Sequence, residues 1–167
     1  LVSGSSGNPV NSFRLGVPAP SSAPTTVKSG TADETATPSD VSYVYTFVTA
    51  TGEEGPPSSP SAVIELTDAE SVAISMPTSA QSSGNFNFGA GALKRIYRSN
   101  TGSTNTQFQF VAAVSYASVT YTDTTDAANL GEILPSGGWI GPPNDDTALY
   151  PDGPLQGLIA LAQGTMA

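Results

Sequence analysis

Residues 41–66 read VSYVYTFVTATGEEGPPSSPSAVIEL and contain the clearest structural pattern of the chain. Over residues 43–48, aromatic side chains alternate with Val and Thr, and this period of two predicts a strand because a strand directs alternate side chains to opposite faces. Residues 51–57, TGEEGPP, are turn formers and end the pattern. Residues 61–66 resume the strand pattern, with Val63 and Ile64 apolar, and follow Pro60, where a missing backbone amide is harmless. The stretch therefore predicts two strands joined by a rigid loop, against which other strands pack.

Further short runs on both sides of this stretch predict additional strands. They lie near Thr26 and Val27 and over residues 71–76, 93–99, 108–114 and 118–122. The proline-containing segment 13–24 is expected to run extended along a sheet edge. The aromatic side chains expected in the core are Tyr43, Phe47, Phe108 and Phe110. About seven strands separated by turn signals predict an all-β, antiparallel, two-sheet sandwich.

The sequence predicts three regions. Residues 1–12 are rich in Ser and Gly and are expected to form a flexible segment or linker. Residues 13–134 are expected to form the sandwich, and residues 135–167 an extended arm that enters a neighbouring domain. Residues 155–166 fit either a short helix or a strand. Since the chain starts at Leu1 and lacks a signal-peptide pattern, we expect a piece of a longer polypeptide.

The composition disfavours several classes of function. The chain has 167 residues, a net charge of −9, five basic residues, no His and no Cys. Five basic residues cannot form an extended phosphate-binding face, so we expect no nucleic-acid partner, and an anionic membrane would repel the chain. Without Cys there are no disulfides, thiolate nucleophiles or Cys-ligated zinc. No stretch approaches the roughly 20 apolar residues of a membrane-spanning helix.

Three segments resemble a fibronectin type III domain. They are YVYTFVTA followed by GEEGPPS (residues 43–50 and 52–58), LKRIYRS (residues 93–99) and VTYTDT (residues 119–124). In that family the strand of the first type comes last, whereas here it precedes the others. The resemblance therefore implies a fibronectin type III or immunoglobulin-like sandwich with a rearranged strand order.

A wider set of segments is similar to a module of tailed-bacteriophage virion proteins. Besides those above, the set includes RLGVPAP at residues 14–20, LGEILPS at residues 130–136 and GLIALAQGTMA at residues 157–167. The resemblance implies a structural protein of the phage tail or connector. It would assemble as a homo-oligomeric ring with copies of itself and neighbouring virion proteins, and it would hold no cofactor.

The sequence offers weak candidates for catalysis and metal binding. Glu53 and Glu54 are adjacent, but two catalytic carboxylates must face each other across a bond, and neighbours on a turn point apart. Asp145 and Asp146, flanked by Asn144 and Asp152, could offer oxygen atoms to Ca²⁺, although their spacing fits no calcium loop. Asp123 and Asp126 are calcium-ligand candidates on the same weak grounds. Without His or Cys the usual nucleophilic triads are absent, and Lys28 and Lys94 lie in no recognisable catalytic context.

Six residues are candidates for an interface, namely Phe86, Phe88, Trp139, Tyr150, Glu53 and Glu54. The aromatic ones could either cap the ends of the core or anchor a neighbouring subunit, because aromatic side chains dominate interface cores. We expect a structural, non-enzymatic role. The main alternative is a carbohydrate- or host-surface-binding module that stacks ligands on Phe86 and Phe88; a spacer module of a secreted enzyme is a third.

Overall fold

The computed structural model describes residues 13–14, 16–81, 83–101 and 106–135. Within this part the chain forms eight strands and one short 3-10 helix. The strands are β1 (Thr25–Ser29), β2 (Ser39–Val41), β3 (Tyr43–Val48), β4 (Ile64–Leu66), β5 (Ser71–Ser75), β6 (Leu93–Thr101), β7 (Thr106–Ser115) and β8 (Thr120–Asp123), and the helix is η1 (Ala127–Asn129).

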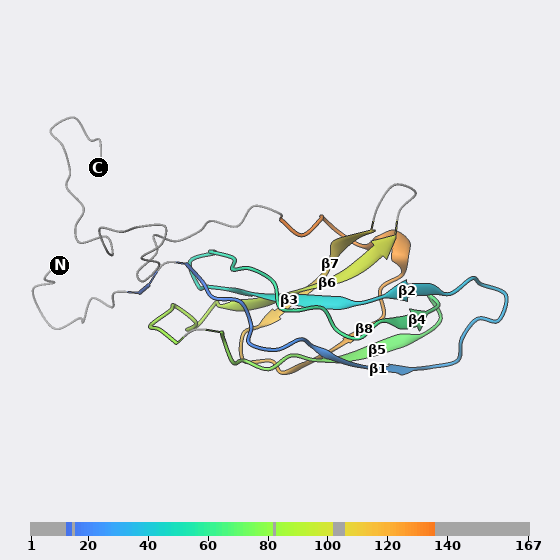
Figure 1. Cartoon of the computed structure of the whole chain (residues 1–167), viewed down its shortest axis with the longest axis horizontal. Coiled ribbons are helices and arrows are strands. Elements are labelled where there is room, and N and C mark those ends of the chain that lie inside the picture. Colours follow the sequence, from blue (N-terminus) through green and yellow to red (C-terminus); the bar gives the residue numbers. More distant parts are fainter. Residues whose placement is uncertain (1–12, 15, 82, 102–105, 136–167) are drawn as a thin grey trace, which may run out of the picture.

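The strands form two facing layers (Figure 1). One layer has the strand order β1-β5-β8, the other has the order β3-β6-β7, and β2 pairs with β4 as an extension of the second layer. Every ladder is antiparallel. The prediction of an all-β antiparallel sandwich is confirmed, and the strands expected near Thr26 and over residues 71–76, 93–99 and 118–122 are present. The fibronectin type III or immunoglobulin-like assignment stays a prediction.

The core lies between the layers and is built around β3. Tyr43, Tyr45 and Phe47 point inward from this strand and are fully buried, as the alternation predicts. The residues between them are also buried, on the outer face, so the strand is covered on both sides. The core cluster consists of Val17, Val41, Tyr43, Tyr45, Phe47, Leu66, Val72, Ile74, Met76 and Ile96.

The loop after β3 returns along the edge of β3 through paired serines. Ser58 donates its backbone N–H to the Tyr45 carbonyl at 2.9 Å, and its hydroxyl accepts the Tyr45 N–H at 3.2 Å. Ser61 makes the same two contacts with Tyr43, at 2.9 and 3.0 Å. Three residues of the loop thus span two residues of the strand, and an excess of this kind defines a β-bulge. The serine hydroxyls act as the acceptors that a regular partner strand would provide through its carbonyls.

Prolines flank these two serines: Pro56 and Pro57 precede Ser58, and Pro60 precedes Ser61. Pro56, Pro57 and Pro60 have no N–H, and none is needed because Ser58 and Ser61 make the contacts to β3. Proline on an outer edge also prevents a further strand from pairing there. The sequence GPPSSPS therefore protects one edge of the β3-β6-β7 sheet.

The prediction that Phe108 and Phe110 lie in the core is wrong. The pairing of β6 with β7 shifts by one residue after Ile96, which faces Ala112, so that Val111 has no partner in the register. This bulge reverses the alternation of β7. Phe108 and Phe110 therefore lie on the outer face and are half-buried, whereas Ala112 packs against the core.

The described residues of the N-terminal segment 13–24 follow the expected extended path, with an isolated bridge at Pro20 and no strand before β1. The backbone of Ser21 donates to the Ser79 carbonyl and that of Gln81 donates to the Ala19 carbonyl, both at 2.8 Å. Val17 is buried in the core. The segment thus runs extended beside the loop that follows β5.

The edge of β7 is also covered. The backbone of Phe110 donates to the Glu132 carbonyl, and the backbone groups of Gly131 and Leu134 donate to the carbonyls of Phe110 and Phe108, each at 2.8 Å. Residues 131–134 therefore extend the sheet beyond β7, and both edges of this layer have a neighbouring segment.

Replacing Ser58 or Ser61 with Ala tests the role of the hydroxyls. Each substitution leaves a buried N–H of β3 without its acceptor, and we expect a loss of about 1–3 kcal/mol in the free energy of unfolding. Ser59→Ala is the matched control, because Ser59 is exposed and its side chain makes no hydrogen bond in the described part of the chain. Chemical denaturation measures the three variants, and an equal stability of Ser58→Ala and Ser59→Ala would contradict the account.

Candidate functional site

Glu53 and Glu54 follow the turn after β3 and make separate contacts. The Glu53 carboxylate accepts the backbone N–H groups of Gly16 and Val17, at 2.8 and 3.4 Å, and so holds the N-terminal segment. At Gly55 a Cβ atom would lie 2.8 Å from Val17, so glycine permits this close approach. Both carboxylates are half-buried. Their different partners agree with the expectation that they do not face each other.

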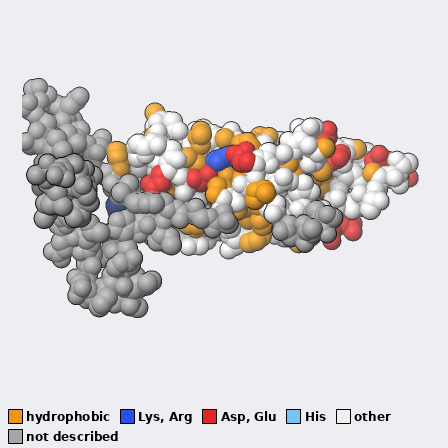
Figure 2. Space-filling model, turned by 90° about the horizontal axis from the view of Figure 1, so that it is seen from above, with side chains coloured by type: hydrophobic (Ala, Val, Ile, Leu, Met, Phe, Trp, Pro, Cys, Tyr) orange, Lys and Arg blue, Asp and Glu red, His pale blue; other side chains and the backbone are white. Residues whose placement is uncertain are grey.

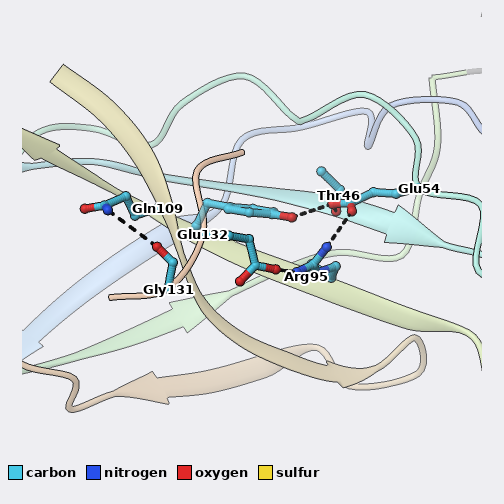
Figure 3. A network of polar contacts seen from close by, with 7 residues as sticks. Thr46, Glu54, Arg95, Gln109, Gly131 and Glu132 are labelled. Carbon is cyan, nitrogen blue, oxygen red and sulfur yellow. Dashed lines mark hydrogen bonds and ion pairs between the residues drawn. The ribbon is translucent and has the colours of Figure 1, made fainter. Parts of the chain in front are cut away.

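The Glu54 carboxylate is the centre of a polar network on the outer face of the β3-β6-β7 sheet (Figure 3). It accepts hydrogen bonds from the hydroxyls of Thr46 and Tyr97, both at 2.6 Å, and pairs with the Arg95 guanidinium at 2.8 Å. Arg95 also pairs with Glu132, on the segment that covers β7. Burial and the hydrogen bond to Glu54 raise the pKa of Tyr97. The network joins the turn after β3, strand β6 and residues 131–134.

Aromatic rings complete this network. The Arg95 guanidinium carbon lies 4.6 Å from the centroid of the Phe110 ring and 5.5 Å from that of Tyr97. Figure 2 shows basic and acidic side chains lying together among hydrophobic ones on this face. A guanidinium between rings and carboxylates gains both cation–π and ionic stabilisation. The charged and aromatic side chains of this network thus contact one another and do not point into an open site.

Between the layers, Arg98 and Asp123 form a buried ion pair. The guanidinium of Arg98 donates to the Asp123 carboxylate at 2.8 Å, and the Tyr43 hydroxyl donates to the same oxygen at 2.8 Å. The other oxygen of Asp123 accepts the backbone N–H of Thr125. Burial, followed by the charge of Asp123, raises the pKa of Tyr43. Asp123 is therefore committed to the core, and this arrangement does not match the calcium-ligand role considered for it.

Lys94 is fully buried, and no carboxylate among the described residues pairs with it. Its ammonium donates to the backbone carbonyls of Met76 at 2.7 Å and Ser118 at 2.6 Å, and it lies 5.8 Å from the centroid of the Tyr116 ring. Burial lowers the pKa of Lys94 to about 8. A neutral amine still has two N–H donors for these two carbonyls, so the contacts suit either protonation state.

Phe86 and Phe88 cap the end of the core, which is one of the two roles expected for them. Phe88 stacks on Tyr116 with 4.3 Å between ring centroids and makes an edge contact with Phe47. Phe86 is buried, and the Arg14 guanidinium lies 5.7 Å from its ring centroid. One face of the Phe88 ring is thus covered by Tyr116, and the Phe88 side chain as a whole is partly buried.

The remaining candidates from the sequence are placed as follows. Trp139, Tyr150, Asp145 and Asp146 lie outside the described residues. Asp126 is exposed. Within the described ranges, no group of three or more His, Cys, Asp or Glu side chains is arranged to hold a metal ion, and no helix there is both long and apolar enough for a bilayer.

A small hollow lies between β2 and β4 on one side and β6 on the other. Its lining includes Asp40, Asp68, Arg98 and Asn100, and its volume is about 30 Å³. A space of this size holds about one water molecule and no organic ligand.

Sequence reasoning missed the buried roles of Lys94 and Arg98. The signal was present, because both residues share the parity of Ile96 in LKRIYRS and must therefore lie on the same face of the strand as that core residue. The pattern could not show which carbonyls or carboxylate accept their hydrogen bonds, since those acceptors lie in β8 and in the segments that follow β5 and precede β8.

Replacing Asp123 with Asn tests the buried ion pair. The change leaves the Arg98 guanidinium buried without its counter-charge, and we expect a loss of about 3–5 kcal/mol in the free energy of unfolding. Asp126→Asn, at an exposed position nearby, is the control and should change stability by less than about 0.5 kcal/mol. Denaturant titration measures both, and similar values for the two variants would refute the tie between the sheets.

The pH dependence of stability tests Lys94. Because its native pKa is lowered from 10.5 to about 8, the unfolded chain binds more protons between these values, and stability therefore rises with pH across this window. We expect the free energy of unfolding of the wild type, relative to Lys94→Met, to be constant below pH 7 and to increase from pH 8 to 10. Denaturation of both proteins over this range measures it, and a constant difference would contradict the assignment.

The chain was compared with protein-family models, with curated proteins and with solved structures. None of these comparisons finds a match.

Proposed function

We propose that this chain is a structural β-sandwich module that acts through contacts with copies of itself and with neighbouring proteins of a larger assembly. The observation that carries the proposal is the use of the basic side chains. All five Lys and Arg residues of the chain are described, and each one holds parts of the fold together. They are Arg14 on Phe86, Lys28 on Glu70, Lys94 on two carbonyls, Arg95 on Glu54 and Glu132, and Arg98 on Asp123.

This use of charge supports a mechanical role. A binding or catalytic site usually has several polar side chains that point into one concave space, where some of their hydrogen-bonding capacity stays free for a ligand. In the described part of this chain, no buried side-chain polar atom lacks a hydrogen-bond partner. The charged groups act as ties between strands and loops.

The assembly that we propose is the virion of a tailed bacteriophage, in its tail or connector. The support is the ordered set of segments similar to phage virion modules, which runs from RLGVPAP at residues 14–20 to GLIALAQGTMA at residues 157–167. In this setting the module has no cofactor and no catalytic role. Its partners are copies of the same chain, arranged as a ring, and adjacent virion proteins.

Two measurements test this function. We expect sedimentation and native mass spectrometry of the chain to show concentration-dependent association into a discrete oligomer, and a glycan array to show no binding. We also expect quantitative mass spectrometry of gradient-purified virions, from the phage that encodes the chain, to recover it in a fixed copy number. A chain that stays monomeric, is absent from virions and binds glycans would overturn the proposal.

A further inference from the structure

The two layers differ in how their edges are protected. In the β3-β6-β7 layer, the proline-rich segment covers β3 and residues 131–134 cover β7. In the β1-β5-β8 layer, no described segment pairs with the outer edge of β1 (Figure 1). An uncovered edge strand presents unpaired backbone N–H and C=O groups, which can pair with a strand of another chain.

The register shows which backbone groups of β1 are free. Met76, just after β5, donates its backbone N–H to the carbonyl of Val119, just before β8. In this part of the chain, even-numbered residues therefore direct their backbone N–H and C=O groups toward β8, and odd-numbered residues direct theirs toward β1. In the β1–β5 register Val27 faces Ala73, an odd-numbered residue. Hydrogen-bonded pairs alternate along an antiparallel ladder, so Thr26 and Lys28 direct their backbone groups outward.

Prolines limit this open edge to a short stretch. Pro20 and Pro24 share the outward parity of Thr26, because Pro20 faces Ala80 in the same register that pairs Thr26 with Ile74. Their missing N–H groups point to the outside, where proline is tolerated and blocks pairing. The edge therefore becomes available at β1 itself.

We propose that β1 pairs with β1 of a second copy of this chain, antiparallel, about a two-fold axis at Val27. The inference rests on the proposed function, since it assigns one of the contacts between copies. Thr26 of each copy would then form two backbone hydrogen bonds with Lys28 of the other copy, one through its N–H and one through its C=O, which gives four hydrogen bonds in all. The two copies of Val27, each 68 % exposed in the single chain, would then face each other.

Competing registers are less favourable. Centring the axis on Lys28 would place two ammonium groups opposite each other, and centring it on Thr26 would place Lys28 opposite Pro24, which has no N–H to donate. Only the register centred on Val27 lets both outward-facing residues use both of their backbone groups without opposing like charges.

Charge explains why β1 is suited to another copy. The chain carries a net charge of −9 and every basic side chain is engaged internally, so two copies cannot meet through a basic patch on an acidic one. In Figure 2 the visible acidic side chains gather mainly toward the end that bears the β1–β2 loop. β1 itself contains no acidic residue, and its Lys28 is paired with Glu70 at 2.9 Å. The outer edge of β8 also has no described partner, but this strand ends at Asp123, close to the exposed Asp126, and is the less suitable choice.

The outer face beside β1 is equally free of charge. In the β1-β5-β8 sheet the outward side chains are Thr25, Val27, Ser29, Ser71, Ala73, Ser75, Thr120 and Thr122. Pairing through β1 would join two such faces into one six-stranded sheet. A pairing of five residues buries less than the roughly 1,000 Å² of a stable interface, so it is weak between isolated chains and is best tested by covalent capture.

A single introduced cysteine provides that test, because the chain has none of its own. The probe is Val27→Cys in the full chain under mild oxidation, with Thr25→Cys and Ser29→Cys as matched controls on the same face. In a non-hydrogen-bonded pair the Cα atoms lie about 4.5 Å apart, close enough for a disulfide, whereas equivalent control positions are about 13 Å apart along the strand. We expect the Val27→Cys dimer to form at least about tenfold faster than either control dimer.

A second variant checks the backbone pairing. Thr26→Pro removes an outward N–H and leaves the ladder to β5 intact, as Pro20 and Pro24 do, so it should abolish the rapid cross-linking of Val27→Cys. Equal cross-linking of all three cysteine variants, or no effect of Thr26→Pro, would overturn the β1 pairing. If the wild-type chain still sediments as an oligomer in that case, the proposed function stands and the contact lies elsewhere. If it is monomeric throughout, is absent from virions and binds glycans, the proposed function fails too.

Discussion

The ion pair between Arg98 and Asp123 is a fully buried charged contact that joins the two layers of this protein. Arg98 belongs to β6 and Asp123 to β8, so this buried contact of 2.8 Å connects the two sheets, and the Tyr43 hydroxyl links β3 to the same carboxylate oxygen. Separating two buried charges is unfavourable unless both find new partners, which fixes how the sheets face each other. The apolar core on its own would accept small shifts of one sheet over the other, whereas a hydrogen-bonded charge pair does not.

The same strategy recurs at the margins of the core. Lys94 ties β6 to the carbonyls that follow β5 and precede β8, and the hydroxyls of Ser58 and Ser61 satisfy the free side of β3. Glu54 joins the turn after β3 to β6 on the outer face. Because buried polar groups are costly when unpaired, each of these contacts specifies one arrangement of a loop or strand. The fold is held by an apolar centre and by polar ties around it.

This organisation has a consequence for function. A chain with few basic residues that are all used internally presents an acidic and neutral exterior, so a contact between two copies is favoured where free carboxylates are absent. The uncharged face and open edge of the β1-β5-β8 layer have this property, while the opposite layer is covered at both edges. The two layers therefore have different roles in our proposal, one stabilising the module and the other meeting a second copy.

The sequence by itself determined the strands whose pattern is local. The alternation in residues 43–48 and 71–76 placed Tyr43, Phe47, Val72 and Ile74 correctly, because the period of two depends only on the geometry of an extended chain. The tertiary structure alone decided the rest. The bulge at Val111 moved Phe108 and Phe110 out of the core, since an extra residue is visible only against the partner strand. The partners of Lys94 and Arg98 lie 18 or more residues away in the chain, and Glu54 pairs with Arg95, which is 41 residues away. Such contacts follow from how the sheets pack rather than from any spacing in the sequence.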